Sequence, residues 1–173
     1  MKKICFVSLF LFAFAFISKA QKGNNEVGIG AELNVLLGSY KDAYGAGFGG
    51  SVKGLYGVGK AGQLSLTLGY SGFKGKSGTL YNGQKFSLIP ILVGYRHHFS
   101  SFYLEPQLGV TNDKTKIPGF TFSETKFTAA LNVGYLVHGF DLSIRYHTEG
   151  DVLSLFAVRA GYNFPLGKGH AKK

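Results

Sequence analysis

Histidine, serine and carboxylate side chains are the residues whose types and spacing could support catalysis in this sequence. His98 and Ser100 are two residues apart, the spacing of sites in which a histidine activates a serine to deacylate a lipid. His147 and Glu149 have the same spacing, but the residue between them is Thr148 and no serine matches them. Such an enzyme must also hold its site at the leaflet that contains its substrate, so the position of these residues in the fold decides their role.

Metal and nucleotide sites are not indicated. His97 and His98 are adjacent, and adjacent residues of a strand point to opposite faces, so they cannot chelate one ion together. Gly28, Gly30 and the stretch Gly45–Gly50 resemble phosphate-binding loops in composition, but no helical pattern follows them. We therefore expect no metal, cofactor or nucleotide, and interpret these glycines as places where backbones pack closely.

The first 20 residues have the pattern of a cleaved signal peptide. Lys2 and Lys3 precede an apolar stretch, Ile4–Ile17, and small residues surround Lys19 just before Gln21. The apolar stretch is shorter than the roughly 20 residues that a membrane-spanning helix needs. We expect a signal peptide over residues 1–20 and one exported domain over residues 21–173. The only cysteine, Cys5, would be removed with the signal.

The charge balance is basic. The full chain has a net charge of +10, and loss of Lys2, Lys3 and Lys19 with no acidic residue would leave +7. An exported chain rarely meets nucleic acid, so we expect no nucleic-acid partner. Anionic lipid and the phosphates of lipopolysaccharide are the expected counterparts of this charge.

Beyond Gln21 the sequence alternates between apolar and polar residues with period two, and no sustained period of 3.6 occurs. This pattern predicts an all-β chain. The eight expected strands are Asn24–Gly38, Tyr44–Val58, Gln63–Phe73, Lys85–Phe99, Phe102–Thr111, Phe122–Val137, Phe140–His147 and Leu153–Phe164.

The connections between these strands alternate in length. Gly59–Gly62, Ser100–Ser101 and His138–Gly139 are tight turns, whereas Lys74–Gln84 and Asn112–Thr121 are longer and polar. Short turns at one end and longer loops at the other are typical of bacterial outer-membrane barrels, whose turns face the periplasm. We expect an eight-stranded antiparallel transmembrane β-barrel with up-and-down meander topology.

The polar phase of the strands distinguishes a membrane barrel from a soluble one. It contains mostly Gly, Ser, Thr and Asn, whereas a water-facing exterior would be rich in Lys and Glu. The apolar phase carries aromatic residues near both strand ends, the pattern of the girdles that lie at the headgroup level. The outer ends carry Tyr44, Tyr70, Phe127 and Tyr146. The girdle at the periplasmic ends comprises Tyr56, Tyr95, Phe99, Phe102, Tyr135, Phe140, Tyr162 and Phe164.

Charged residues on the polar phase would share the interior of the barrel. A lone charge there would cost several kcal/mol, so we expect opposite charges to pair across hairpins and to plug the lumen rather than to form an ion pathway. Arg145 has no evident partner. The expected pairs are Glu32 with Lys53, Arg96 with Glu105, and Asp141 with Arg159.

Two consecutive strands resemble a known family. The run Phe86–Arg96 (FSLIPILVGYR), followed by Phe102–Val110 (FYLEPQLGV), resembles the strand-turn-strand of the outer-membrane protein β-barrel domain family, which includes PorT-like proteins. The architecture also resembles OmpA and OmpX barrels. The PorT-like resemblance implies an accessory role in a secretion or transport assembly. Tyr162 and Phe164 are the candidates for the aromatic signal read by the barrel-assembly machinery, although a basic tail, Pro165–Lys173, follows them.

These observations predict a small, non-enzymatic barrel in the outer membrane with a structural or interaction role. His98 and Ser100 would lie at the periplasmic rim, away from an outer-leaflet substrate, so we expect no catalytic residue. The outer loops, including Lys74–Lys85 and Asn112–Glu124, are the expected contact surfaces. An accessory role in transport, a lipid-modifying activity and a small channel remain the alternative functions.

Overall fold

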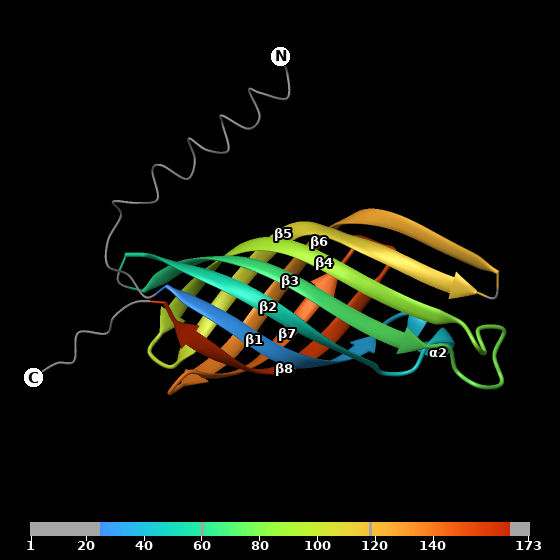
Figure 1. Cartoon of the computed structure of the whole chain (residues 1–173), viewed down its shortest axis with the longest axis horizontal. Coiled ribbons are helices and arrows are strands. Elements are labelled where there is room, and N and C mark those ends of the chain that lie inside the picture. Colours follow the sequence, from blue (N-terminus) through green and yellow to red (C-terminus); the bar gives the residue numbers. More distant parts are fainter. Residues whose placement is uncertain (1–24, 60, 118, 167–173) are drawn as a thin grey trace, which may run out of the picture.

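The structure is a computed structural model that describes residues 25–59, 61–117 and 119–166. The expected signal peptide and most of the basic tail lie outside these residues. The described residues form eight strands that close into one antiparallel barrel in sequence order (Figure 1). The strands are β1 (Glu26–Leu36), β2 (Gly47–Val58), β3 (Gly62–Lys74), β4 (Lys85–Phe99), β5 (Phe102–Ile117), β6 (Phe120–Val137), β7 (Phe140–Thr148) and β8 (Ser154–Pro165).

The first and last strands pair with each other and close the barrel. Gly28 lies opposite Asn163, and Leu36 lies opposite Leu155 at the other end of the same antiparallel pair. Closing the sheet on itself removes the two free edges that an open sheet would have, which is the condition for spanning a bilayer with strands. The expected eight-stranded meander is confirmed. Among the described residues, no helix is long and apolar enough to cross a membrane.

The barrel exposes its apolar residues and buries its polar ones. On β1, the apolar side chains of Ile29 and Leu33 are 49% and 42% exposed. The polar side chains of Glu32 and Asn34, which flank Leu33, are only 4% and 0% exposed. A soluble barrel has the opposite arrangement, because it packs its apolar face inward. This polarity fits an exterior surrounded by lipid.

A small apolar cluster closes the interior at the end with the longer loops. Tyr44 is 5% exposed and packs against Phe86, with ring centroids 5.3 Å apart. The expectation that Tyr44 belongs to the outer aromatic girdle is therefore wrong. The short helix α2 (Tyr40–Ala43), which the alternation did not predict, precedes Tyr44 and turns its ring inward.

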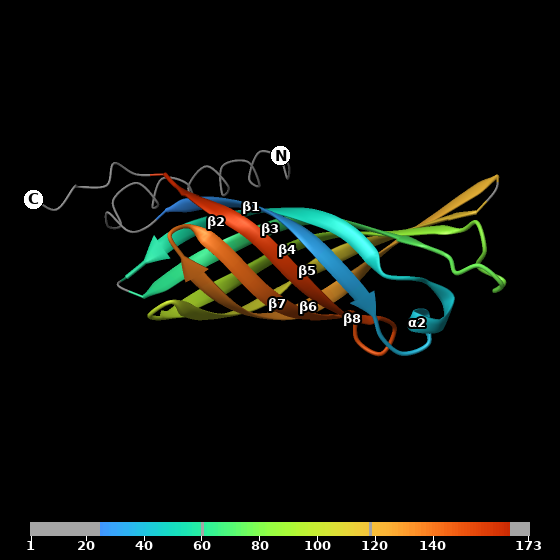
Figure 2. The same cartoon turned by 90° about the horizontal axis from the view of Figure 1, so that it is seen from below.

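The β5–β6 hairpin extends far beyond β7, and β4 accompanies β5 as far as Lys116, one residue before the end of β5. The expected loop Asn112–Thr121 is mostly strand, because Thr115 pairs with Phe122 and Ile117 with Phe120 before a tight turn. β6 has 18 residues and β7 has only nine, so one side of the barrel wall is much taller than the other (Figure 2). Alternation failed here because both faces of the hairpin leave the lipid and no longer require opposite polarity.

Inward-facing glycines allow neighbouring strands to approach closely. A Cβ atom on Gly109 of β5 would lie 2.1 Å from the carbonyl oxygen of Ile91 on β4, and backbone atoms cannot give way as a flexible side chain would. A Cβ on the outward-facing Gly54 would meet no atom within 4 Å. A methyl group at Gly109 would therefore clash with the neighbouring backbone, whereas one at Gly54 would not.

We expect Gly109→Ala to lower the free energy of unfolding by about 1–3 kcal/mol, because it overpacks the β4–β5 contact. Gly54→Ala is the matched control and should change it by less than about 0.5 kcal/mol. Urea titration of the folded fraction, followed by the mobility of unboiled protein in a gel, measures both. Equal effects of the two substitutions would contradict the packing argument.

Candidate functional site

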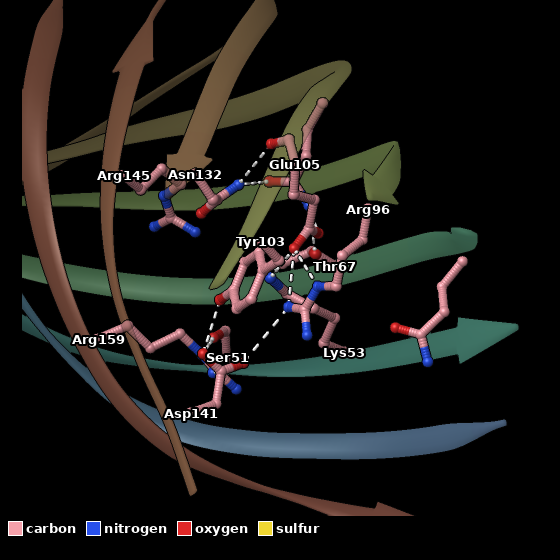
Figure 3. Close-up of polar contacts among 12 residues, drawn as sticks. Ser51, Lys53, Thr67, Arg96, Tyr103, Glu105, Asn132, Asp141, Arg145 and Arg159 are labelled. Carbon is pink, nitrogen blue, oxygen red and sulfur yellow. Dashed lines mark hydrogen bonds and ion pairs between the residues drawn. The ribbon is translucent and has the colours of Figure 1, made fainter. Parts of the chain in front are cut away.

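Arg96 lies at the centre of a network of charges inside the barrel (Figure 3). Its Nε donates to Oε2 of Glu105 at 2.9 Å, and its Nη2 lies 3.3 Å from Oδ2 of Asp141. The guanidinium carbon is 3.7 Å from the ring centroid of Tyr103, whose hydroxyl donates to Oδ1 of Asp141 at 2.6 Å. One cation from β4 therefore joins acids from β5 and β7.

Two further cations complete this part of the network. Lys53 Nζ donates to Oε2 of Glu105 at 3.0 Å, and Arg159 Nη1 donates to Oδ2 of Asp141 at 3.1 Å. Two of the three expected ion pairs, Arg96 with Glu105 and Asp141 with Arg159, are thus present in the structure.

The expected pair of Glu32 with Lys53 does not form. Glu32 lies opposite Gly49 and Lys53 opposite Gly28, so the two side chains are four residues apart along the β1–β2 ladder. Glu32 instead accepts a hydrogen bond from Nη2 of Arg145, the cation to which the sequence assigned no partner. The expected pair requires a hairpin centred between Asp42 and Ala43, whereas the observed register is centred between Tyr40 and Lys41, inside helix α2.

Neutral polar side chains hold the charged groups in place. Gln107 Nε2 donates to Oε1 of Glu105 and to Oγ1 of Thr67, both at 2.8 Å. Asn132 Nδ2 donates to Oε1 of Gln107 at 2.9 Å, and Ser51 Oγ donates to Oε1 of Glu32 at 2.6 Å. Sequence reasoning did not single out these residues, although their place on the polar phase was a usable signal.

The network contains more cations than carboxylates. Three acids, Glu32, Glu105 and Asp141, meet four bases, Lys53, Arg96, Arg145 and Arg159. All seven side chains are at most 5% exposed. Each carboxylate is therefore shared by two cations, and loss of a carboxylate should harm the fold more than loss of a cation.

A second polar cluster lies at the loop end of the interior. Lys126 Nζ on β6 donates to Oδ2 of Asp113 on β5 at 3.0 Å, and His147 Nε2 lies 3.1 Å from Oε1 of Glu149. Asp113 stands above the apolar belt, because its outward-facing neighbours on β5, Asn112 and Lys114, are polar. Burial and the nearby Glu149 carboxylate raise the pKa of Asp113 to about 6, and burial also raises the pKa of Glu149.

The two sets of residues considered for catalysis lie at opposite ends of the barrel. His98 Nε2 lies 2.8 Å from Oε1 of Gln63, and Ser100 occupies the β4–β5 turn with a φ of 62°. His147 is buried against Glu149 at the opposite end. Among the described residues, no group of three His, Cys, Asp or Glu side chains is placed to hold a metal ion.

The aromatic residues expected at the turn end do face outward there. Phe102 lies opposite both Phe99 and Tyr135, and Phe140 lies opposite Tyr162. The rings of Phe102 and Tyr135 and those of Phe140 and Tyr162 make edge contacts, with centroids 4.9 and 5.2 Å apart. The set forms a band around this end, at the level of both chain ends of the barrel. Tyr56, Tyr95, Tyr162 and Phe164 continue the band and are half-buried or exposed.

No family model and no curated protein matches the sequence. Solved structures do match this barrel. One is Ail, the attachment invasion locus protein of Yersinia pestis, which matches with a TM-score of 0.62 and 16% identity, over 83% of this chain and 100% of Ail. The fold is that of a small outer-membrane β-barrel.

Two other structures support the same fold. Neisserial surface protein A matches this barrel with a TM-score of 0.60 and 18% identity, over 82% of this chain and 96% of that protein. The N-terminal barrel domain of OprF from Pseudomonas aeruginosa matches with a TM-score of 0.51 and 17% identity, over 83% and 100%. Identities this low show a shared fold of the OmpA and OmpX kind. They do not single out the PorT-like proteins.

The surplus of cations in the barrel leads to a prediction about Glu105. Glu105→Gln removes the carboxylate shared by Lys53 and Arg96, so we expect it to lower the free energy of unfolding by about 3–5 kcal/mol. Arg96→Met should cost less, because Glu105 keeps Lys53 and Asp141 keeps Arg159. Urea titration of the folded fraction of each variant measures the order.

Two controls test the cause of this effect. Adding Lys53→Met to Glu105→Gln removes an unpaired ammonium and should restore about 0.5–3 kcal/mol. Glu124→Gln, at an ion pair whose carboxylate is 72% exposed, should cost less than about 1 kcal/mol. A larger loss from Arg96→Met than from Glu105→Gln would show that the surplus of cations does not govern stability.

The raised pKa of Asp113 predicts a dependence of stability on pH. An ordinary aspartate has a pKa of 3.8, so between pH 4 and about 6 the folded protein binds more protons than the unfolded chain, and its stability falls as the pH rises. Asp113→Asn should flatten this fall and should stabilise the barrel more at pH 7.5 than at pH 4. Thermal unfolding at a series of pH values measures it, with the exposed Asp42→Asn as control. Equal slopes in all three proteins would refute the assignment.

Proposed function

We propose that this protein is an integral outer-membrane barrel that acts as an interaction protein through its loop end. The observation that carries the proposal is the asymmetry of the wall. A strand crosses a bilayer in about 9–11 residues, whereas β5 has 16 and β6 has 18, so their hairpin projects well past the membrane. A barrel with a purely structural role has no need of such an extension.

The projecting hairpin and the adjacent loop present apolar side chains to solvent. Phe120 and Phe122 on β6 are 68% and 62% exposed, and Leu80 in the loop between β3 and β4 is 95% exposed. The β5–β6 hairpin and the β3–β4 loop lie at the same end of the barrel, opposite the start of β1 and the end of β8 (Figure 1). Exposed aromatic residues on a rigid hairpin are typical of contact surfaces. The structure of Ail with the heparin analogue sucrose octasulfate offers a parallel, since that barrel binds a partner of its own.

The interior supports a closed barrel rather than a channel. Eight strands leave an interior just wide enough for side chains to fill, and the large side chains of Arg96, Tyr103 and Lys53 are fully buried within it. The charges of Arg96 and Lys53 are paired with Glu105, so an ion would have to break these pairs to pass. We propose that the lumen is plugged, and that the signal peptide delivers the chain to the barrel-assembly machinery.

Labelling on whole cells tests the location and the orientation. Cys5, the only cysteine, would leave with the signal peptide, so an introduced cysteine would be the only one in the exported chain. Leu80→Cys and Thr121→Cys should react with a membrane-impermeant maleimide on intact cells. Ser101→Cys, in the turn at the other end, should react only after the outer membrane is permeabilised. Reaction of all three on intact cells, or recovery of the protein in the soluble periplasmic fraction, would reject the proposal.

Three assays separate this function from the alternatives. Conductance in a planar bilayer that disappears in Glu105→Gln would indicate a channel, and the proposal expects no conductance. A change in lipopolysaccharide that requires His147 would indicate a lipid-modifying enzyme. Cross-linking of Thr121→Cys into a large complex would favour an accessory role in secretion or transport. We expect no such large complex.

A further inference from the structure

Three lysines form a row across neighbouring strands at the loop end of the barrel. Lys74 on β3 lies directly opposite Lys85 on β4, and Lys85 lies directly opposite Lys116 on β5. All three side chains are exposed and share the outward phase of their strands. Figure 1 shows the three strands side by side at this end. Lys114 stands two residues nearer the membrane on β5, opposite Ser87.

This row is unfavourable in the protein alone. Like charges directly opposite each other on adjacent strands destabilise a sheet, and here one lysine faces two others. The acids nearest along the hairpin do not compensate, because Asp113 faces inward and both Asp113 and Glu124 pair with Lys126. Neighbouring positive charges of this kind are stabilised by an anion that binds several of them at once.

The row forms the rim of a groove of about 680 Å³ on the outside of the barrel. From the lysines toward the middle of the barrel, the groove is lined first by Ser87 and then by Tyr70, Phe48 and Ile89. The side chains of Tyr70 and Phe48 are 55% and 72% exposed. No acidic residue lines it. Polarity therefore changes from charged to hydroxyl to aromatic and aliphatic over a few residues along the barrel wall.

We propose that this groove binds a phosphate-bearing lipid of the outer leaflet. Its phosphate would lie against Lys74, Lys85 and Lys116, and its acyl chain would pack on Phe48 and Tyr70. The inference rests on the proposed location, because it requires the loop end to meet the outer leaflet. A free phosphate matches only the rim, whereas a lipid matches the rim and the apolar floor together.

Another outer groove shows what distinguishes this one. It lies over β1, β2, β3, β7 and β8 and has a volume of about 930 Å³. Residues such as Ile29, Val52 and Leu68 line it, and none of its lining side chains is charged. Such a surface fits any acyl chain and selects no headgroup. Of these two grooves, the lysine-rimmed one combines both recognition elements.

The test compares two double variants of the full-length protein after its export, purified in a nonionic detergent. Lys85→Gln with Lys116→Gln removes two charges from the row. Lys41→Gln with Lys76→Gln removes two exposed charges outside the groove. Native mass spectrometry measures binding of diphosphorylated lipid A, with phosphatidylcholine and inorganic phosphate as the comparison probes.

We expect the wild-type protein and the Lys41, Lys76 variant to bind lipid A alike, and the Lys85, Lys116 variant to bind it about 30-fold more weakly. Phosphatidylcholine should bind weakly to all three. An equal loss of lipid A affinity in both double variants would show that only the net charge of the protein matters, and would overturn the proposal. Inorganic phosphate that competes as well as lipid A would show a phosphate site without a lipid, and would also overturn it.

The outcome is separable from that of the proposed function. Gel mobility of unboiled protein reports whether each variant is a folded barrel, and labelling of Leu80→Cys on cells reports whether the loop end faces outward. A folded, correctly oriented barrel without preference for lipid A would leave the interaction role intact and remove the lipid site.

Discussion

The fold depends on one constraint: charges placed in a narrow, closed interior must be neutralised there. Water cannot solvate them in a barrel filled by side chains, so each ion has to find its counter-charge within the network. Arg96, shared by Glu105 and Asp141, meets this requirement across three strands at once. A shift of one strand by two residues would break these pairs, so the network also fixes the register in which the barrel closes.

The neutral side chains around the ions follow from the same constraint. A carboxylate has more acceptor sites than one cation fills, and Gln107 and Ser51 occupy acceptor sites on Glu105 and Glu32. The exterior has the opposite requirement, since lipid offers no hydrogen bonds and accepts only apolar side chains. The inside is therefore specified by pairing and the outside by hydrophobicity alone, which explains why the exterior alternation is regular while the interior residue types vary.

Beyond the lipid these requirements end, and the structure there becomes irregular. The β5–β6 hairpin continues as a ladder with solvent on both faces, a short helix and a cluster around Tyr44 and Phe86 close the interior, and lysines appear on the outward phase. The tall side of the wall thus carries both the exposed aromatic residues of β6 and the row of lysines on β3, β4 and β5. Both the interaction surface and the lipid groove are consequences of the same extension of β3, β4, β5 and β6.

The sequence by itself determined the fold class, the number of strands and two of the ion pairs, Arg96 with Glu105 and Asp141 with Arg159, which join strands consecutive in the chain. Period-two alternation predicts the strands correctly wherever one face of the sheet meets lipid. The two-residue turn between β4 and β5 fixes the register that brings Arg96 and Glu105 together. Only the tertiary structure decided the contacts across the barrel, such as that of Arg145 with Glu32, which are 113 residues apart in the chain. The closure of β1 on β8 and the position of the first hairpin's centre set those contacts. The extended β5–β6 hairpin lacks the difference in polarity between faces on which alternation depends. The lysine row likewise needed the registers of two strand pairs, because residues as distant as Lys74 and Lys116 become neighbours only when three strands are aligned.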